Sequence, residues 1–462
     1  MKSKNLVKSL SKMLTILVGL ALISTTGCKK DDDDDNTTPS NVVNFTLTTL
    51  TDGTIQVEGS TNQTYTFDDT KKYLLKGFVY VEEGGVLNVD AGTVITGDKA
   101  SKGTLIVKRG GKINAIGTAA DPIVFTSAED IGSRNPGDWG GIIICGKAPI
   151  NLAGGEGQIE GGPDALYGGT DAADNSGTLK YVRIEYAGIP FQPNQEINGL
   201  TLGGVGSATT IDYIQVSYCG DDSYEMFGGT VNLKHIISFK TTDDDLDTDN
   251  GFIGKVQFGV VLRDGNIADV SGSNGFESDN DANGSTLTPN TKAIFSNISI
   301  FGPKSDTSTS VNSNFKRGAH LRRNTQTSIY NSLISGYPVG LLVDGSACEG
   351  NATGDALQVR NTIIATCNTP LAVASGSTFN INAWFTTPSY GNSIQYDNTG
   401  LANAPYASTP DFLPAGGSIL LSGADFTNTN LSGMEVVTFR GAFGTTDWTS
   451  GWANWDPQNT AY

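Results

Sequence analysis

Aspartate-rich runs are the part of this sequence whose residue types and spacing can do chemistry. The densest run contains Asp243, Asp244, Asp245, Asp247 and Asp249. Carboxylates this close together repel one another, and a bound cation relieves that repulsion. We therefore expect Asp243, Asp245, Asp247 and Asp249 to be cation ligands. The expected ion is Ca²⁺, because it prefers oxygen ligands.

A second acidic run matches the first half of a calcium-binding loop. The segment Asp279-Asn-Asp-Ala-Asn-Gly places oxygen ligands at alternate positions, and its glycine permits the turn. Its expected ligands are Asp279, Asp281 and Asn283. Position twelve is Asn290 rather than a bidentate Glu, so complete EF-hand geometry is not expected, and an acidic surface turn is the alternative. We predict a cation site in one of the two runs.

Composition narrows the classes of partner and site. The net charge is -18 at pH 7, and without the four lysines of residues 1–27 it becomes -22. Nucleic acid is not expected as a partner, because this charge repels its phosphates. An acidic body suits divalent cations or a cationic partner. With only two His and few Cys, a Cys–His zinc cluster is excluded.

Four cysteines follow Cys28, and they permit three pairings in an oxidising compartment. Cys145 and Cys219 lie in apolar runs, so we expect them to be small buried side chains. Cys348 and Cys367 are 19 residues apart, close to the contour length of one solenoid coil. A disulfide between these two is therefore left open.

Short apolar runs alternate with Gly, Asn and Asp turns from about Gly77 onward, and no segment keeps a helical period. One run recurs, and its equivalent positions are taken as Arg183, Gln215, His235, Asn297, Asn331 and Asn361. The intervals are 20 to 34 residues, with one of 62 that covers two coils. Such units must stack to bury their apolar faces. The sequence predicts an all-β fold, a right-handed single-stranded parallel β-helix; a β-sandwich pair or a propeller is the alternative.

An open solenoid exposes strand edges and core at both ends, so caps are expected. We expect an N-terminal β cap over residues 45–75, the β-helix over 76–382 and an irregular C-terminal capping region over 383–462. Three of the five Trp lie in the last 15 residues. They could stack on a sugar or dock a partner; the alternative is a cap that folds back on the helix.

Residues 1–27 have the order of a lipoprotein signal peptide. Four lysines precede an apolar run from Met13 to Ile23, and small residues then lead to Cys28. Cys28 is the predicted lipid attachment site, since several acyl chains give stable anchoring to a membrane. Thr25 stands where lipoboxes usually carry Leu.

Residues 28–44 are expected to form an acidic tether. Lys29 and Lys30 followed by Asp31 to Asp35 resemble the export signal that sends lipoproteins of some Gram-negative bacteria to the cell surface. The alternative is a solvated, self-repelling spacer. The expected location is the outer face of the outer membrane, with lipid anchoring.

Several segments resemble a family of bacterial outer-membrane parallel β-helix lipoproteins with a pectate-lyase-like fold, mostly of unknown function. They are Gly220-Asp-Asp-Ser-Tyr-Glu-Met-Phe-Gly-Gly-Thr-Val, Asp243-Asp-Asp-Leu-Asp-Thr-Asp-Asn-Gly, Gly137-Asp-Trp-Gly-Gly-Ile, Tyr181-Val-Arg-Ile-Glu-Tyr-Ala-Gly and the tryptophan-rich terminus. Ser223 and Tyr224 replace the usual Gly-Ile of this family. The resemblance covers about residues 80–462 and implies an accessory role beside a TonB-dependent outer-membrane transporter.

The expected fold is also similar to that of polysaccharide lyases and pectin hydrolases. A lyase needs a base beside calcium, for which Lys255 or Lys240 is available. A hydrolase needs two carboxylates, with Asp221, Asp222 and Asp244 as candidates. The Gly-His-Gly and Arg-Ile-Lys signatures of pectin hydrolases are absent from the sequence.

A shared fold by itself carries little chemistry. We therefore expect the protein to bind or capture an extracellular ligand, which could be a glycan, a phosphorus compound, a peptide or a metal chelate. A calcium-dependent polysaccharide lyase or hydrolase, and a structural adhesion module, are the alternatives.

Overall fold

The computed structural model describes residues 42–192, 195–397 and 400–462. Contacts divide the chain into residues 1–41 and residues 42–462, and the description concerns the second unit. The predicted signal peptide (1–27), Cys28 and most of the predicted tether (28–44) lie outside the described residues. Among the described residues, no helix combines the length and the apolar character that a membrane crossing requires.

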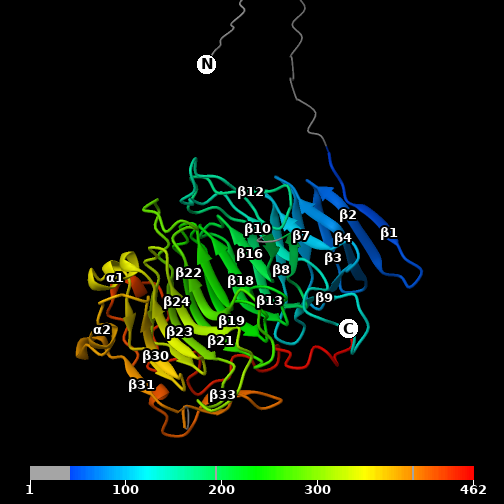
Figure 1. Ribbon diagram of the computed structural model, residues 1–462. Helices are drawn as coiled ribbons and strands as arrows, with labels where there is room; N and C mark the ends of the chain where they lie inside the picture. The colour runs from blue at the N-terminus through cyan, green and yellow to red at the C-terminus, as the bar shows by residue number, and fades with distance from the viewer. Residues whose placement is uncertain (1–41, 193–194, 398–399) are drawn as a thin grey trace, which may run out of the picture. The chain divides into compact units, whose positions relative to one another are not determined.

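Parallel strand pairing forms three stacks around one core (Figure 1). Stack one contains β2 (Ile55–Thr61), β4 (Lys72–Val81), β7 (Thr104–Val107), β10 (Gly141–Cys145), β16 (Leu200–Gly203), β18 (Tyr224–Phe227), β20 (Leu246–Asp249), β22 (Ser273–Ser278), β24 (Phe315–Leu321), β27 (Val339–Val343) and β30 (Thr369–Val373). Stack two contains β3 (Thr64–Phe67), β5 (Val86–Val89), β8 (Lys112–Ile116), β13 (Gly177–Glu185), β17 (Thr210–Ser217), β19 (Asn232–Phe239), β21 (Lys255–Leu262), β23 (Ile294–Phe301), β25 (Ser328–Tyr330) and β28 (Val359–Arg360). The predicted parallel β-helix is confirmed.

Stack three shares its long strands with the other two stacks. It contains β6 (Val94–Gly97), β9 (Ile123–Ser127), β26 (Leu333–Ser335), β29 (Ile363–Ala365) and β31 (Ser393–Gln395), together with parts of β2, β4, β13, β17, β19, β21 and β23. Parallel pairing already begins at Ile55, where β2 joins β4. The β-helix therefore starts within residues 45–75, the range in which an N-terminal cap was expected. Only β1 (Thr46–Thr49) adds to this end in the antiparallel direction.

The remaining elements lie outside the three stacks. They are the hairpins β11 (Gly157–Gln158) with β12 (Leu166–Tyr167), β14 (Ile189–Gln192) with β15 (Gln195–Ile197) and β32 (Ala402–Ala404) with β33 (Asp411–Pro414), the helices α1 (Ser346–Thr353) and α2 (Ile381–Phe385), and the 3-10 turns η1 (Pro388–Tyr390), η2 (Ile419–Leu421) and η3 (Thr429–Leu431). Trp384 and Phe385 of α2 belong to the core cluster, and the Trp384 indole donates to the carbonyl of Ala352 in α1. The two helices thus pack onto the C-terminal end of the core.

A corner with left-handed backbone joins stack two to stack three on successive coils. Its residues have φ between 49° and 62°, and they are Tyr181, Tyr213, His235, Phe258, Asn297, Asn331 and Asn361. Arg183 and Gln215 were therefore assigned two positions too late, and Phe258 was missed. The four rings stack along the axis with centroids 4.4, 4.3 and 5.2 Å apart. The interval of 62 residues spans two coils, as predicted, because β21 lies between β19 and β23.

The core forms because alternate residues of each strand point inward and meet their equivalents on the next coil. One inward column of stack one consists of Leu105, Ile142, Leu200, Tyr224, Leu246, Phe276, Ala319 and Leu341. The Tyr224 hydroxyl donates to backbone carbonyls of Ile214 and Ile237, both at 2.9 Å. Its polar atom is therefore satisfied inside the core.

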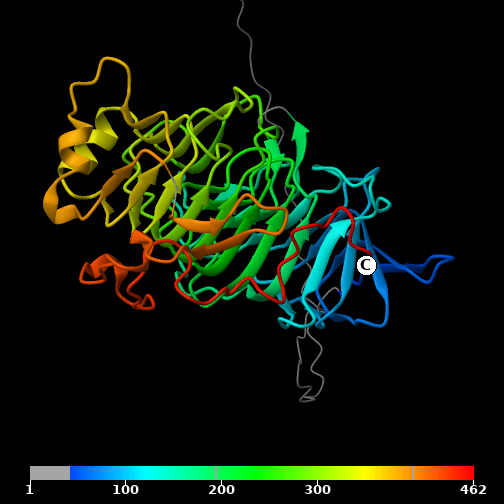
Figure 2. The same ribbon diagram turned by 90° about the horizontal axis from the view of Figure 1, so that it is seen from below.

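Residues 424–462, the C-terminal strap, run back beside the corner toward the N-terminal coils (Figure 2). Corner and neighbouring amides bind its backbone: Asn331 exchanges hydrogen bonds with Asp425, Gln257 with Glu435 and Gln215 with Asn454. Trp448 and Trp452 pack edge-on against the ring of Tyr213. The terminal tryptophans thus pack against the β-helix, in line with the alternative in which this region folds back.

The four cysteines of the described residues are free and buried: Cys145, Cys219, Cys348 and Cys367. Burial of Cys145 and Cys219 was expected from their apolar runs. No disulfide joins Cys348 to Cys367, although each lies in the core. Burial raises the pKa of the Cys219 thiol to about 12, so the reactive thiolate is not populated at neutral pH.

Candidate functional site

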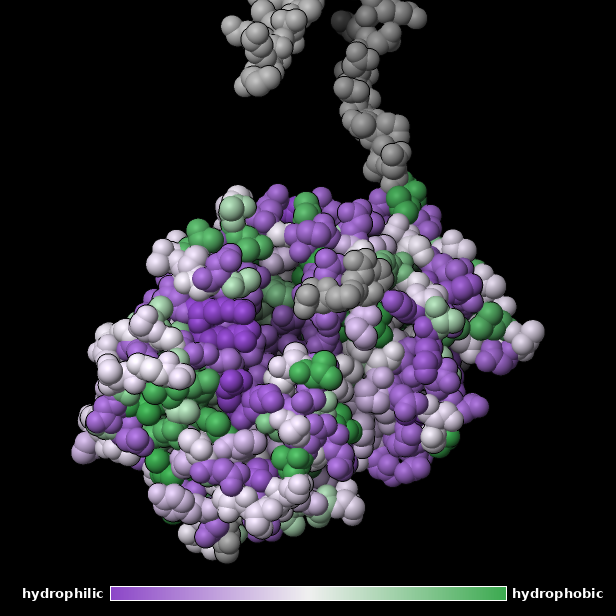
Figure 3. Space-filling model, in the orientation of Figure 1, coloured by the Kyte–Doolittle hydropathy of each residue, from purple (hydrophilic) through white to green (hydrophobic). Residues whose placement is uncertain are grey.

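A cavity of about 490 Å³ opens on the outer face of stack one, and we call it the acidic cavity. In Figure 3, hydrophilic residues gather around a hollow over β16, β18 and β22. Twelve carboxylates line it: Glu160, Glu196, Asp221, Asp222, Glu225, Asp243, Asp244, Asp247, Asp249, Asp269, Glu277 and Asp279. Among the lining residues that the structure describes, the basic side chains are Arg322 and Arg323.

Strand register places one column of acids on successive coils. Thr201 aligns with Glu225, then with Asp247, Glu277 and His320. Adjacent parallel strands lie about 4.8 Å apart, so these carboxylates are neighbours although they are distant in the chain. His320 closes the column, with its ring nitrogens 3.3 Å from Glu277 and 2.9 Å from Asp344.

A second column lies at the turns that lead into these strands. An oxygen of Asn198 accepts the backbone N–H of Asp222, an oxygen of Asp222 accepts that of Asp244, and an oxygen of Asp244 accepts that of Asn274. One carboxylate oxygen on each of these aspartates is therefore held in place by the next coil. The aspartates have a structural role that an amide could also perform.

The far wall of the acidic cavity carries its positive charge. Arg322 Nε lies 2.8 Å from Asp279 Oδ1, and Arg322 also pairs with Glu277. Arg323 lies 2.7 Å from the other oxygen of Asp279, and its side chain is 43% exposed. Both arginines are thus already engaged with carboxylates of the wall.

Three groups of side chains could each hold a cation, because one oxygen from each member lies within 4.8 Å of the others. The groups are Asp221 with Asp222 and Asp243, Asp222 with Glu225 and Asp247, and Asp244 with Asp247 and Glu277. The donors are all carboxylate oxygens, which suit hard cations such as Ca²⁺ or Mg²⁺ rather than zinc or copper.

Three buried oxygens in this cluster accept no hydrogen bond within the described part of the chain. They are Oδ1 of Asp243, Oδ1 of Asp247 and Oδ1 of Asn274. A buried acceptor without a partner costs about 1–3 kcal/mol, so such atoms are rare in folded proteins. Asn274 is 1% exposed, and its amide nitrogen contacts Asp244 and Glu277. A bound cation or water could supply the partner that these acceptors lack.

Burial and mutual repulsion raise the pKa values of the carboxyls in the acidic cavity. Burial raises the pKa of Asp243 to about 6 and that of Asp249 to about 7. The same cause, with neighbouring carboxylates, holds the pKa well above its ordinary value at Asp221, Asp222, Glu225, Asp244 and Asp247. Burial and crowding thus favour the protonated form of these carboxyls, and a bound cation would favour the ionised form.

Glu277 is an exception in the same cavity. Burial acts to raise its pKa, but the hydrogen bond with His320 and the charges of Arg322 and Arg323 outweigh it and lower the pKa. Glu277 is therefore ionised whether or not a cation is present.

The structure brings most of the predicted acidic residues together. Those that line the acidic cavity are Asp221, Asp222, Asp243, Asp244, Asp247, Asp249 and Asp279. Asp245 does not join them, which corrects its assignment as a ligand. Its side chain points into the core and pairs with Arg263 at 3.2 Å. The turn places Asp243 and Asp244 outside and Asp245 inside.

The predicted ligands of the calcium-type loop do not lie together in the structure. Only Asp279 reaches the acidic cavity, where the two arginines hold it. Asp281 instead accepts hydrogen bonds from the backbone of Asn283 and Ser285 and from the Ser285 hydroxyl. Asp281 and Asn283 do not line the acidic cavity, and Asp281 forms turn hydrogen bonds with its own loop.

Both lysines that were proposed as a lyase base lie away from the acidic cavity. Lys255 donates to the backbone carbonyl of Ser432 in the C-terminal strap, within another pocket. Lys240 lies over the rings of Tyr218 and Phe239 and lines a third pocket. Neither lines the acidic cavity, so their assignment as bases beside the cation is corrected.

Sequence reasoning missed five of the lining carboxylates: Glu160, Glu196, Glu225, Asp269 and Glu277. Glu225 and Glu277 follow from register alone, since each occupies the position of Asp247 on an adjacent coil. Aligning the coils residue by residue could have found these two. The other three come from loops and a hairpin, whose placement no repeat reveals.

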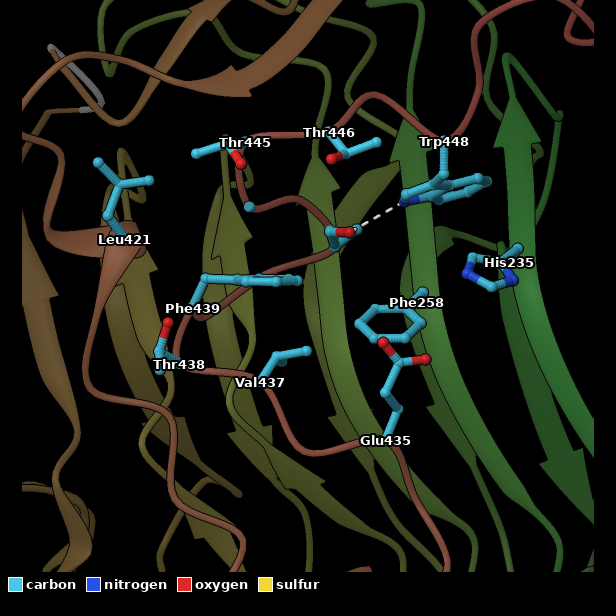
Figure 4. A pocket seen from close by; sticks show the side chains of 12 residues that line it. His235, Phe258, Leu421, Glu435, Val437, Thr438, Phe439, Thr445, Thr446 and Trp448 are labelled. Carbon is cyan, nitrogen blue, oxygen red and sulfur yellow. Dashed lines mark hydrogen bonds between the residues drawn. The ribbon is translucent and has the colours of Figure 1, made fainter.

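A second cavity, of about 370 Å³, lies between the corner and the C-terminal strap (Figure 4). His235, Phe258, Phe439 and Trp448 surround it, and the Trp448 indole donates to the carbonyl of Ala442. Trp448 stacks on Phe443 at 5.2 Å, and Phe258 is only 4% exposed. The rings are mainly used to pack the strap, so the acidic cavity is the stronger candidate for function.

Two solved structures and one family model are similar to this chain. Pectate lyase Pel9A shares 12% identity, with a TM-score of 0.31 over 79% of this chain and 89% of that chain. The Dettilon tailspike protein (gp208) shares 11% identity, with a TM-score of 0.23 over 67% of this chain and 62% of that chain. No curated protein matches. The family described as "Pectate-lyase like beta helix domain" matches residues 59–406. The chain belongs to this pectate-lyase-like β-helix family.

Proposed function

We propose that the acidic cavity binds divalent cations, Ca²⁺ first, and that the bound cations capture an anionic extracellular glycan. The observation that carries the proposal is the convergence of three carboxylate groups in which a buried oxygen of Asp243 and one of Asp247 accept no hydrogen bond within the described residues. A cation would supply the missing partner for the carboxylates and relieve their repulsion. Extracellular calcium modules bind with Kd values of about 10⁻⁴–10⁻³ M, which suits a site open to solvent.

The negative charge of the acidic cavity is the reason why an anionic ligand would need a bound cation. Twelve carboxylates against two arginines repel a polyanion directly. Cations bound by the three ligand groups would offset part of this negative charge and could keep coordination positions for carboxylates of uronic acid residues. The half-exposed Arg323 offers a further contact for the same ligand.

Binding is favoured over catalysis by the surroundings of the cation groups. A lyase needs a base beside the cation, yet Lys255 and Lys240 lie elsewhere, and both arginines of the cavity are ion-paired. The hydrolase candidates Asp221, Asp222 and Asp244 are members of the cation groups. Their raised pKa values follow from burial and crowding and do not distinguish an acid from a base.

Calcium titrated into protein that has been stripped with EDTA is expected to give binding heat and a rise in Tm. Ligand at 100 times its Kd stabilises by about 2.7 kcal/mol. Polygalacturonate should then be retained on the immobilised protein with Ca²⁺ and released by EDTA. The measurements are isothermal titration, thermal unfolding and a retention assay.

The possible results of this experiment test cation binding, glycan capture and the absence of catalysis separately. No heat and no Tm shift with Ca²⁺ or Mg²⁺ would contradict the cation site. Calcium binding without retention of the polyuronate would contradict its use in capture. Products that absorb in the near ultraviolet would identify a lyase and overturn the choice of binding over catalysis.

We propose further that the body is anchored by lipid at Cys28 on the outer face of the outer membrane, beside a TonB-dependent transporter. The support is the order of residues 1–27 and the Lys29-Lys30-Asp31 to Asp35 tag. Labelled palmitate is expected to enter the wild type and not the Cys28→Ala variant. Equal labelling of the two would contradict the anchor, and purification without any transporter after mild detergent extraction would contradict the partner.

A further inference from the structure

An ion pair inside the core lies directly beneath the acidic cavity. Arg263 is 3% exposed and Asp245 is 0% exposed, and Nη1 of the arginine lies 3.2 Å from Oδ1 of the aspartate. The core around them is otherwise mostly apolar. Backbone hydrogen bonds link this turn to both adjacent coils: the N–H of Ser223 donates to the carbonyl of Asp244 at 3.0 Å, and the N–H of Asp245 donates to the carbonyl of Asn274 at 3.3 Å. The buried charge thus belongs to the coil that carries the densest acidic turn.

Stability alone is a weak reason to keep such a pair. Removing two ions from water costs several kcal/mol each, and apolar replacements of similar volume are often neutral or stabilising. Arg263 Nε has no hydrogen-bond partner in the described part of the protein, which adds to the cost. The other contacts of Arg263 therefore have to explain why this ion pair is present.

Arg263 holds the backbone of the acidic turn. Its Nη1 donates to the carbonyl of Asp243 at 2.6 Å, and its Nη2 donates to the carbonyl of Thr242 at 3.1 Å. The Thr242 carbonyl also accepts from the Ser273 hydroxyl at 2.8 Å and from the backbone N–H of Asp269 at 3.0 Å. The turn is thus held from the core side and from the following coil.

The arginine is itself fixed from several sides. Its guanidinium lies 5.1 Å from the ring centroid of Phe315. Asp245, its partner, accepts hydrogen bonds from the Ser238 hydroxyl and, at 3.4 Å, from the Tyr337 hydroxyl. A planar guanidinium with several fixed donors can serve two carbonyls and a carboxylate at once, which a lysine ammonium cannot match.

We propose that Arg263 is a positioning residue for the cation site. From inside the core it holds the turn at Thr242 and Asp243, so that the carboxylates of Asp243 and Asp244 face the acidic cavity before a cation arrives. Asp243 belongs to the first cation group and Asp244 to the third. This inference rests on the proposed cation binding. Residues that orient ligands in this way typically contribute 10–100-fold to metal affinity.

The test compares calcium affinity with stability in EDTA. The double variant Arg263→Met with Asp245→Leu replaces the pair by apolar side chains and leaves the net charge unchanged. It is expected to fold, with a Tm in EDTA equal to or above that of the wild type, and to bind Ca²⁺ about 10–100-fold more weakly. Arg263→Lys keeps the charge but loses the fork of donors, so an intermediate loss is expected.

Controls separate the possible outcomes. Arg360→Met removes another buried arginine, which pairs with Asp355 away from the acidic cavity, and should leave calcium affinity unchanged. Wild-type affinity in a folded double variant overturns the role of Arg263 alone. If the double variant fails to fold, wild-type affinity in Arg263→Lys overturns it instead. No calcium binding by the wild type refutes the proposed function, and the two failures are thereby distinguished.

Discussion

The Asp247→Asn variant is expected to lose calcium binding and to be more stable than the wild type when cations are absent. Asp247 belongs to two of the three cation groups, so its replacement weakens both. Loss of one charged ligand from each group should raise the calcium Kd at least 100-fold, or about 2.7 kcal/mol. Isothermal titration against EDTA-treated protein measures this loss.

The gain in stability has the same origin as the loss of binding. Burial, and then Glu277 and Asp244, hold the pKa of Asp247 well above its ordinary value. An amide removes this repulsion, and its N–H₂ group can donate to the neighbouring carboxylates. We expect a gain of about 1–3 kcal/mol in the free energy of unfolding, measured with denaturant in EDTA.

Asp164→Asn is the matched control, because this exposed carboxylate lines a different pocket. It removes one negative charge and should change neither calcium affinity nor stability appreciably. Wild-type affinity in Asp247→Asn would show that the column of acids on stack one is not the cation site. Reduced stability of this variant in EDTA would show that Asp247 is not under electrostatic strain.

The cation-free protein is expected to lose stability as the pH rises from about 4 to about 7. The ordinary pKa of an aspartate is 3.8, whereas the folded protein raises that of Asp243 to about 6 and that of Asp249 to about 7. In this window the folded state binds more protons than the unfolded state, so the free energy of unfolding falls with increasing pH. Two pKa units correspond to about 2.7 kcal/mol.

The charged groups around these two carboxyls determine the size of the effect. After burial, Asp249 is affected by Asp279, Asp281 and Arg323. After burial, Asp243 is affected by its hydrogen bond with Ser271, then by Asp269, Arg263 and Glu277. Glu277 acts in the opposite direction, because its pKa is lowered and its stabilisation is lost only as the pH falls below its ordinary value of 4.5.

Urea unfolding in EDTA at about pH 5 and about pH 8 measures this dependence. Saturating Ca²⁺ should reverse the order, because deprotonated carboxylates bind the cation and protonated ones do not. The Asp247→Asn variant should show a smaller change with pH in EDTA. A cation-free protein that becomes more stable between pH 5 and pH 8 would contradict the raised pKa values.

Together these expectations describe a site that favours function over stability. Strand register holds carboxylates close together, although we expect the cation-free protein to be more stable with an amide at Asp247. Sites that carry strain of this kind are common where binding requires it. Cation binding would then contribute to the stability of the β-helix as well as to ligand capture.

The fold could be predicted from the sequence because its signals are local. Short apolar runs and turn residues recur at coil-like intervals, and runs that cannot bury their faces alone must stack. The acidic clusters were also visible, since Asp243 to Asp249 lie in one run. The spacing of Asp279, Asp281 and Asn283 did not reveal that only Asp279 lines the acidic cavity, while Asp281 accepts hydrogen bonds from its own turn.

The site depended on register between coils, which sequence spacing does not specify to a single residue. A shift of one position moves a side chain from the cavity to the core. Alternation alone would put Asp245 and Asp247 on the same face, and only the tertiary structure showed that the bend at Asp245 turns it toward Arg263 inside, while Asp247 faces the cavity beside Glu225 and Glu277.

The local sequence pattern did not predict the path of the C-terminal strap either. Its contacts join Asn331 to Asp425 and Gln215 to Asn454 across long separations in the chain. The sequence by itself determined that strands stack and that many carboxylates are available. The tertiary structure alone decided which of them meet, because side-chain direction and long-range contact are set by packing between coils rather than by neighbours in the chain.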